Sequence, residues 1–377
     1  MVKILATVIS IIISFMLGHR ELEQQKNAWI ALGGTLDPST LDAPPLPDAQ
    51  NAAVAYEPLF SFLNGLTPEE QDLFGEDPAE VPEVEALLIK CHDVIVKLRL
   101  ASQIPGCRWN VKYEDWLNTV YYHYGESRKA CRLLKSDARL ASSQGRDMDA
   151  VQDIESILRI AKHMSNDRTM IGLLVAIGEL RQGTDLFEEL FRRGPAPDSE
   201  IMHLTQRFDP RKMFRRMLFC EVAISEAKMS QMMSEDGWDG FKVSPVGRLE
   251  SDWDRAYFLK VMCGILEDCD KTFYEAPIQE DNLPSYAITS KLFLPAFSRS
   301  AYSAAMAHLR ILMLQTADKL RAYKAELGEY PKVGVIEMPI DPVTGERLVY
   351  GKVGEGFVLT SEVVEHDGKK IEWVWEK

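Results

Sequence analysis

The chain has 377 residues, of which 46% are hydrophobic and 27% are charged, and its formal net charge is -14 at pH 7. The length predicts two or three packed units, and the composition lies in the range of globular proteins that bury a sizeable core. The acidic balance argues against nucleic acid as a partner, because phosphate binding needs a basic face, and against general adhesion to anionic lipid.

The chain opens with an apolar segment, residues 4–17, that is interrupted only by one threonine and two serines. A helix of this length is about 21 Å long, shorter than the ~30 Å hydrocarbon core of a bilayer, which is typical of a signal-peptide core or a short signal anchor. Cleavage after Gly18 would place the large Met16 where a small residue is preferred, so we expect a retained anchor over 1–20. The expected partner is the cytoplasmic membrane, with the bulk of the chain extracytoplasmic; a buried cytosolic helix is the alternative.

A linker is predicted after this segment, because residues 33–50 (GGTLDPSTLDAPPLPDAQ) contain four prolines and no apolar period. The body that follows has mainly helical periodicity. The predicted organisation is an N-terminal anchor or signal peptide over 1–20, the linker over 33–50, an α-helical domain over 51–297, and a long helix with a β cap over 298–377.

The most regular helical pattern lies in the middle of the chain. One helix is predicted to end near Ser143, Gly145 supplies a turn, and Asp147 caps the next helix. A third helix is expected to begin near Asp167 and to run toward Phe191 as an antiparallel neighbour. The expected core face of the second helix is Met148, Val151, Ile154, Leu158, Ala161 and Met164.

Small and apolar residues are placed in this region where two helices can pack closely. They are Ala138, Ala141, Gly145, Ala150 and Leu158. With these residues the segment resembles one tetratricopeptide-type hairpin. A solenoid needs about three stacked units, and no clear second copy is present, so the resemblance implies a helical hairpin rather than a peptide-binding superhelix.

No catalytic motif is found: the histidines lack metal-binding spacings, and there is no nucleophile elbow, phosphate-binding loop or dinucleotide fingerprint. Glu221 is the one acid in an apolar helical run. It is either an acid or base with a perturbed pKa, or an acid that lies at the helix edge or is paired with Arg215 or Arg216. Asp236 and Asp239 offer oxygen ligands for a cation, but the spacing of a calcium loop is missing, so a solvated loop is expected.

Three aromatic side chains, Trp109, Tyr113 and Trp116, fall in a predicted loop and either anchor it by packing or contact a ligand. His308 lies in a helix that is apolar around much of its circumference, and we expect a core histidine with its polar atoms satisfied rather than a ligand. No cofactor or metal is expected.

The cysteines are scattered without a C-x-x-C motif and are expected to be mostly buried small hydrophobes: Cys91, Cys107, Cys131, Cys220, Cys263 and Cys269.

The tail, residues 326–361, reads ELGEYPKVGVIEMPIDPVTGERLVYGKVGEGFVLTS. Gly328 is a helix stop, Pro331 prevents the helix from resuming, and Asp341 and Pro342 with Gly345 build a tight turn. The segments RLVYGKV, GFVLTS and KKIEWVW predict three strands of an antiparallel meander.

Eight residues carry a family resemblance here: Gly328, Tyr330, Pro331, Asp341, Pro342, Gly345, Tyr350 and Gly356. This pattern resembles the C-terminal half of type II secretion major pseudopilins and of exported bacterial proteins that carry the same half. The resemblance covers about 60 residues and implies a small sheet packed on the end of a long helix. The calcium-binding, Asp-rich loop of that family is replaced by EVVEHDGKKIEW, and the early glutamate of its apolar run is missing, so neither calcium nor the pilin function is carried over.

The sequence therefore predicts a mainly α fold, a helical bundle or hairpin array with a small C-terminal antiparallel β-meander. The expected function is that of an envelope-anchored interaction or assembly protein, with envelope or secretion-system proteins as partners and no reaction of its own. Two alternatives stay open: an enzyme with a dispersed acidic site that includes Glu221, and a small-ligand carrier that uses the loop from Trp109 to Trp116.

Overall fold

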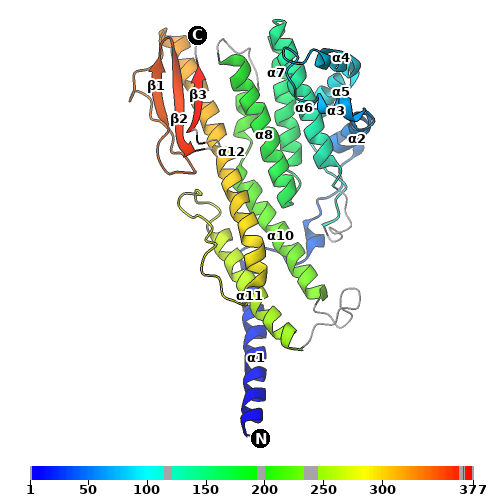
Figure 1. Ribbon diagram of the computed structural model, residues 1–377, viewed down its shortest axis with the longest axis vertical. Coiled ribbons are helices and arrows are strands. Elements are labelled where there is room, and N and C mark those ends of the chain that lie inside the picture. The colour runs from blue at the N-terminus through cyan, green and yellow to red at the C-terminus, as the bar shows by residue number, and fades with distance from the viewer. Residues whose placement is uncertain are drawn as a thin grey trace.

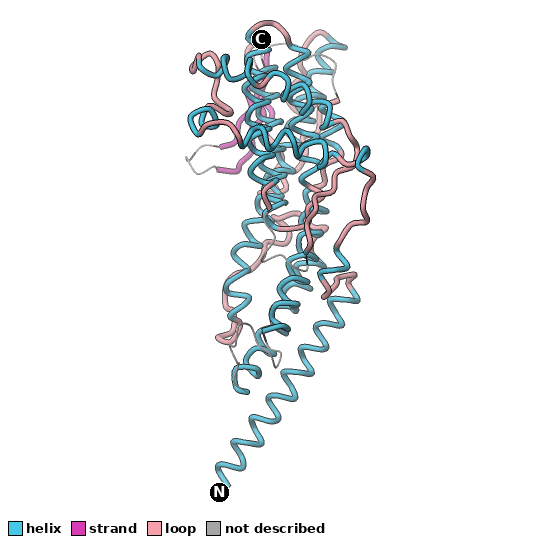
Figure 2. The backbone as a smooth tube through the Cα atoms, turned by 90° about the vertical axis from the view of Figure 1, so that its right-hand side faces the viewer, coloured by secondary structure: helices cyan, strands magenta, loops and turns pink. Residues whose placement is uncertain are grey.

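The structure, a computed structural model, describes residues 2–113, 121–192, 200–232, 245–364, 368 and 370–375. It is elongated and mainly helical, with a small sheet at one end and the N-terminal helix projecting at the other (Figures 1 and 2). The predicted fold class is confirmed. The helices are α1 (Val2–Ala31), α2 (Ala52–Asn64), α3 (Pro68–Asp72), α4 (Glu83–Lys90), α5 (His92–Ser102), α6 (His123–Ser143), α7 (Asp147–Met164), α8 (Met170–Phe191), α9 (Ile201–Gln206), α10 (Pro210–Met232), α11 (Pro245–Glu267) and α12 (Ile288–Leu327).

The predicted hairpin is formed by α6 and α7, and α8 packs against both. Gly145 makes the turn with a φ of 72°, a left-handed conformation that glycine adopts at low cost. Two details of the prediction are wrong. Asp147 is the first helical residue and Arg146 occupies the cap without a side-chain hydrogen bond, and Met148 is 54% exposed. The rest of the predicted core face of α7 is buried: Val151, Ile154, Leu158, Ala161 and Met164.

The third helix of this bundle, α8, begins slightly later than predicted. Thr169 is its N-cap, and its hydroxyl accepts a hydrogen bond from the N–H of Gly172 at 3.0 Å. A threonine cap of this kind satisfies an N–H that the helix itself leaves without a partner.

Helix α12 is the longest element and runs from beside α11 to the sheet (Figure 1). It packs against α8, α10 and α11, as expected of a central helix. It starts ten residues before the predicted start at Ser298, although Pro295 removes one N–H within it. The start is held from outside: the carboxylate of Asp254 in α11 accepts hydrogen bonds from the N–H and the hydroxyl of Thr289.

The first helix, α1, corrects the predicted membrane anchor. Among the residues that the structure describes, no helix is long and apolar enough to cross a bilayer. The apolar run stops at Leu17, and the following turns are charged and pack against α11, with Leu22 and Trp29 buried. Gly18 lies so close to Trp253 that a Cβ there would stand 2.9 Å from the indole nitrogen. The signal anchor and the localisation built on it are therefore wrong as predictions, whereas a contact of residues 4–17 with the membrane stays a prediction.

Residues 33–50 run along the body and contain two short 3₁₀ turns, Pro38–Leu41 and Asp48–Gln50. Asp37 caps the first turn by accepting from the N–H of Ser39, and Leu41 is buried. The proposed division of the chain at residues 51 and 298 stays a prediction.

The C-terminal cap has the predicted meander of β1 (Val349–Val353), β2 (Gly356–Val364) and β3 (Lys370–Trp375), antiparallel in the order β1-β2-β3. Gly354 and Gly368 adopt positive φ beside the ends of the strands. One face of the sheet is buried against α8 and α12, where Trp375 stacks on Phe357 and contacts Phe187. Arg321 of α12 lies over the ring of Trp375, so the sheet closes the end of the long helix.

Candidate functional site

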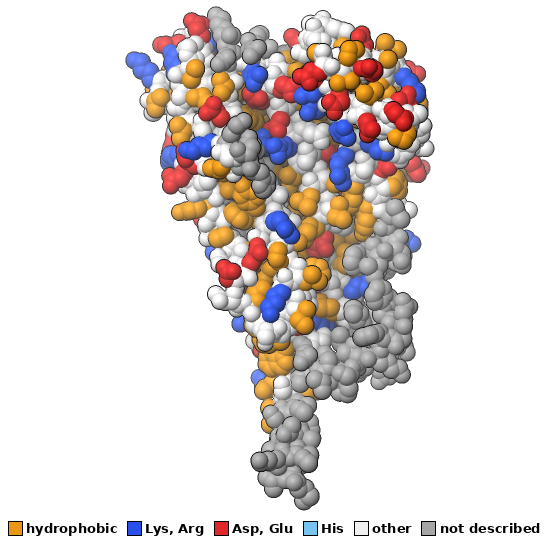
Figure 3. All heavy atoms as spheres, viewed as in Figure 1, with side chains coloured by type: hydrophobic (Ala, Val, Ile, Leu, Met, Phe, Trp, Pro, Cys, Tyr) orange, Lys and Arg blue, Asp and Glu red, His pale blue; other side chains and the backbone are white. Residues whose placement is uncertain are grey.

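The candidate site is a cavity of about 310 Å³ where α10, α11 and α12 meet, closed on one side by the loop 268–287. Hydrophobic side chains gather below the sheet on the face that Figure 3 shows. A cavity of this size lies at the lower end of the range for small-molecule sites. Its apolar lining includes Phe214, Tyr257, Val261, Ile265, Phe273, Ile278, Leu283, Ala301, Ala304 and Ala305.

Two helices make room for the cavity by presenting small residues to each other. Ala301, Ala304 and Ala305 recur at the spacing of one helix face on α12. Gly264 of α11 lines the same space, and a Cβ added there would meet no atom within 4 Å. Glycine in a helix interior is less favourable than alanine by about 1 kcal/mol. Gly264 therefore lowers the stability of α11 and leaves open space beside it.

A few polar groups are set into the apolar wall. His308 continues the alanine face of α12, and its Nδ1 is buried with no hydrogen-bond partner among the described residues. Burial lowers the pKa of His308, and the nearby positive charge of Arg211 lowers it further. The prediction of a satisfied core histidine is therefore wrong: this imidazole lines a cavity and keeps one nitrogen free.

Arg211, near the start of α10, is the cation of this wall. One guanidinium N–H donates to the backbone carbonyl of Asp270 at 2.7 Å, and no carboxylate within the described ranges pairs with it. The other charged groups at the cavity belong to its rim. Asp268 pairs with Lys271 at 2.6 Å, both about half exposed, and Asp281 is exposed.

The loop that closes the cavity is fastened to the C-terminal cap. The N–H of Tyr274 donates to the carbonyl of Pro342 at 3.3 Å, and Pro342 itself lines the cavity. Gly345 has a φ of 78°, and a Cβ on it would overlap the ring of Tyr274. The turn therefore requires glycine both for its backbone and for the close approach of the tyrosine.

The rest of the tail motif holds this turn in place. The buried carboxylate of Asp341 accepts from the N–H of Val343 at 2.7 Å and from the hydroxyl of Ser361 on β2. The hydroxyl of Tyr350 donates to the carbonyl of Pro331 at 2.7 Å. In addition, Tyr330 packs edge-on against Phe357, and Gly328 ends α12 with a φ of 83°. Seven of the eight motif residues thus have structural roles, and Gly356 is the first residue of β2. Through Pro342 and Gly345 the motif also reaches the cavity.

The candidate acid Glu221 lies elsewhere and has a structural partner. Its carboxylate accepts a hydrogen bond from the N–H of Met170 at 2.7 Å, at the N-terminus of α8. Burial raises its pKa, and the hydrogen bond from Met170 opposes that effect. Pairing with Arg215 or Arg216 is not seen; Arg215 instead lies near Asp270, with a nitrogen–oxygen distance of 3.7 Å.

The aromatic loop is a packing element in the part that the structure describes. Trp109 and Tyr113 are buried, and Trp109 stacks on His123 with ring centroids 4.5 Å apart. His123 and Tyr124 both contact the buried carboxylate of Asp167, at 3.2 and 2.7 Å. Trp116 lies outside the described residues.

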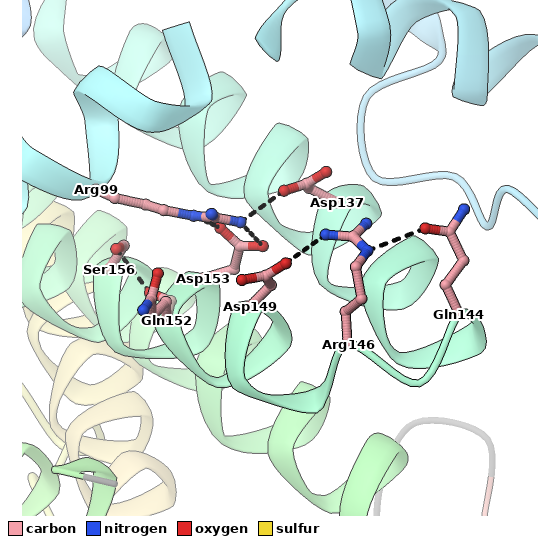
Figure 4. Close-up of polar contacts among 8 residues, drawn as sticks. All are labelled: Arg99, Asp137, Gln144, Arg146, Asp149, Gln152, Asp153 and Ser156. Atoms are coloured by element: carbon pink, nitrogen blue, oxygen red, sulfur yellow. Dashed lines mark hydrogen bonds and ion pairs between the residues drawn. The ribbon is translucent and has the colours of Figure 1, made fainter. Parts of the chain in front are cut away.

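A buried ion cluster joins the smaller helices to the bundle (Figure 4). Arg99 of α5 donates to both oxygens of Asp153 on α7, at 2.7 and 2.8 Å, and to Asp137 on α6 at 2.7 Å. Asp153 is fully buried, and burial raises its pKa well above the ordinary value. The cluster is a structural crosslink between three helices, and it lies apart from the cavity.

Neither a metal centre nor a disulfide is found among the described residues. No group of three or more metal-ligating side chains occurs among the described residues, and Asp236 and Asp239 lie outside them. All six cysteines are free and buried, as expected. Cys269 lines the cavity, and burial raises the pKa of its thiol to about 12, which keeps it protonated near neutral pH.

Sequence reasoning did not find the cavity. The signal that was available is the combination of a helical glycine in α11 with three alanines on one face of α12, but only the fold shows that these faces meet.

Compared with known proteins, the chain matches no family model, no curated protein and no solved structure. The likeness of its tail to pseudopilins therefore stays a resemblance of short motifs.

Proposed function

We propose that this protein binds a small, largely apolar molecule in the cavity between α10, α11 and α12. The observation that carries the proposal is the open, apolar space of about 310 Å³ beside Gly264 and the alanine face of α12. The space is a cleft with one side open to solvent, and Gly264 is exposed at its edge. A space of this size, lined by apolar side chains with a few polar groups, is the usual form of a ligand site.

The small-ligand carrier was one of the expected alternatives, but the site lies in a different place. The loop at Trp109 is engaged in packing, whereas the cavity lies at the loop 268–287 and the helices behind it. The proposal of an enzyme with an acidic site draws no support from Glu221, because its carboxylate serves the N-terminus of α8.

Two substitutions at Gly264 test the proposal. Gly264→Phe places a large side chain in the open space, whereas Gly264→Ala adds one methyl group and leaves most of the space. Both replace a helical glycine and are expected to keep or raise the stability of α11, by about 1 kcal/mol for alanine. Binding of octanol and octanoate is measured by isothermal titration calorimetry.

The proposal predicts that at least one probe binds the wild-type protein and Gly264→Ala, and that Gly264→Phe loses binding without a fall in its urea unfolding midpoint. Equal binding by all three proteins would place the ligand elsewhere. Absence of binding by the wild type would remove the proposal.

A role in assembly is a second proposal, supported by α1. This helix projects from the body (Figure 2), and several of its large apolar side chains are exposed. They are Ile13, Phe15, Met16 and Leu17, with Met16 66% exposed. Sedimentation and crosslinking of the full chain, with Phe15→Glu as the control, test it. A wild type that stays monomeric and forms no crosslinked species would contradict it.

A further inference from the structure

The polar groups of the cavity define the chemistry of its occupant more narrowly. From the unpaired guanidinium of Arg211 and the free Nδ1 of His308 set in an apolar wall, we infer that the ligand is an amphiphile with a carboxylate at one end and a short hydrocarbon chain. This inference rests on the proposed function, and the experiment below separates the failure of one from the failure of the other.

The size of the cavity limits the length of the chain. At the ~30 Å³ that a water occupies in the liquid, the volume of about 310 Å³ holds on the order of ten non-hydrogen atoms. Beside Gly264 and the three alanines, the side chains of Val261, Ile265 and Leu283 offer hydrocarbon contact. A chain of about eight carbons with one polar end fits this volume and this lining.

The polar group of the ligand is inferred from the hydrogen-bonding groups of Arg211 and His308 that have no protein partner among the described residues. The guanidinium of Arg211 has several N–H donors, and only one of its hydrogen bonds is found, to the carbonyl of Asp270. A carboxylate would fill the remaining donors in the forked geometry that guanidinium groups prefer. His308 is kept in its neutral form by burial and by Arg211, so its Nδ1 is free to donate one further hydrogen bond to the same group.

The acidic side chains near the cavity do not cancel the positive charge of Arg211. Asp268 is compensated by Lys271 at the rim, and Asp209 is bound to Lys212 through its backbone N–H and its ammonium, both at 3.0 Å. Asp281 is exposed to solvent. Arg211 is half-buried and has no carboxylate partner among the described residues, whereas Asp281 faces solvent at the rim, and this difference favours an anion over an ammonium ligand of equal length.

The test compares three probes that differ only in their polar end: octanoate, octanol and octylamine. Their dissociation constants are measured by calorimetry near pH 7.5, where the acid is ionised and the amine is charged. The variants are Arg211→Gln and, as a matched control, Arg215→Gln, which removes a charge from the same helix at a residue that does not line the cavity. Gly264→Phe reports whether a probe occupies the cavity.

We expect octanoate to bind the wild type at least ~10-fold more tightly than octanol, because one charge-assisted hydrogen bond contributes a free energy of that size. Octylamine should bind more weakly than either. Arg211→Gln should reduce octanoate to the level of octanol and leave octanol unchanged, while Arg215→Gln should change neither. Equal affinity for octanoate and octanol, both lost in Gly264→Phe, would overturn the carboxylate assignment and leave the cavity as a binding site. Tighter octanoate binding that Arg211→Gln does not weaken would also overturn it, and failure of all three probes would overturn both proposals.

Discussion

Glu179 offers a direct test of how burial sets the charge of a side chain in this protein. It lies on α8 and is fully buried, and neither of its carboxylate oxygens has a hydrogen-bond partner among the described residues. Burial raises its pKa from 4.5 to about 8, against smaller opposing effects of the neighbouring Ser127 and Arg128. The folded protein therefore holds a neutral carboxylic acid at pH 7, while the unfolded chain has released the proton.

The sign and size of the effect follow from this difference. Below pH 4.5 both states are protonated and Glu179 has no pH-dependent effect. Above pH 4.5 Glu179 ionises in the unfolded chain but stays neutral in the folded protein. The free energy of unfolding therefore falls by about 1.4 kcal/mol for each pH unit, until the pH reaches the folded pKa near 8. The loss of unfolding free energy is then about 3 kcal/mol at pH 7 and about 5 kcal/mol at pH 8.

Glu179→Gln removes this dependence, because glutamine has a similar shape and does not ionise. Urea unfolding of both proteins at several pH values from 4 to 8 measures it, with the exposed Glu85→Gln as the control. We expect the stability of the glutamine variant relative to the wild type to rise steadily with pH, and the control to follow the wild type. Parallel pH profiles for wild type and Glu179→Gln would refute the reasoning.

Three further predictions concern the framework around the site. Arg99→Ala should cost about 3–5 kcal/mol in urea unfolding, because it leaves Asp153 buried without its cation, and adding Asp153→Asn should recover part of the loss. Gly345→Ala should cost more than the ~1–2 kcal/mol of a left-handed backbone, since its methyl group displaces the ring of Tyr274; no loss would contradict the close approach. Glu221→Ala should lower stability by about 0.5–2 kcal/mol as a lost helix cap, whereas Glu221→Gln keeps an acceptor and should cost less; equal losses would argue against the cap.

The local features of the fold could be predicted because local rules govern them. Gly145 and Gly328 were expected at a turn and at a helix end, and both adopt positive φ there. The three strands of the cap follow from alternating sequence and flanking glycines, and their order follows from their short connections. These predictions needed only residues that are neighbours in the chain.

The features that were missed depend on contacts between distant segments. The apolar start of α1 was taken for an anchor, because nothing in the first residues indicates that Gly18 and Trp29 pack on helices more than 180 residues later. The apolar sequence around His308 predicts a satisfied histidine, whereas the cavity beside it is formed by α10, α11 and the loop 268–287, which are distant in the sequence. The candidate site therefore became visible only when α10, α11 and α12 were placed together.

The central claim is that the space beside Gly264 holds a small carboxylate amphiphile, and a crystal structure of the protein with octanoate tests it most directly. The account predicts electron density for the hydrocarbon chain between α11 and α12, next to Gly264 and Ala304, with the carboxylate within hydrogen-bond distance of Arg211 and the Nδ1 of His308. Density for octanoate at another place, or a cavity that stays without octanoate at saturating concentration, would contradict it.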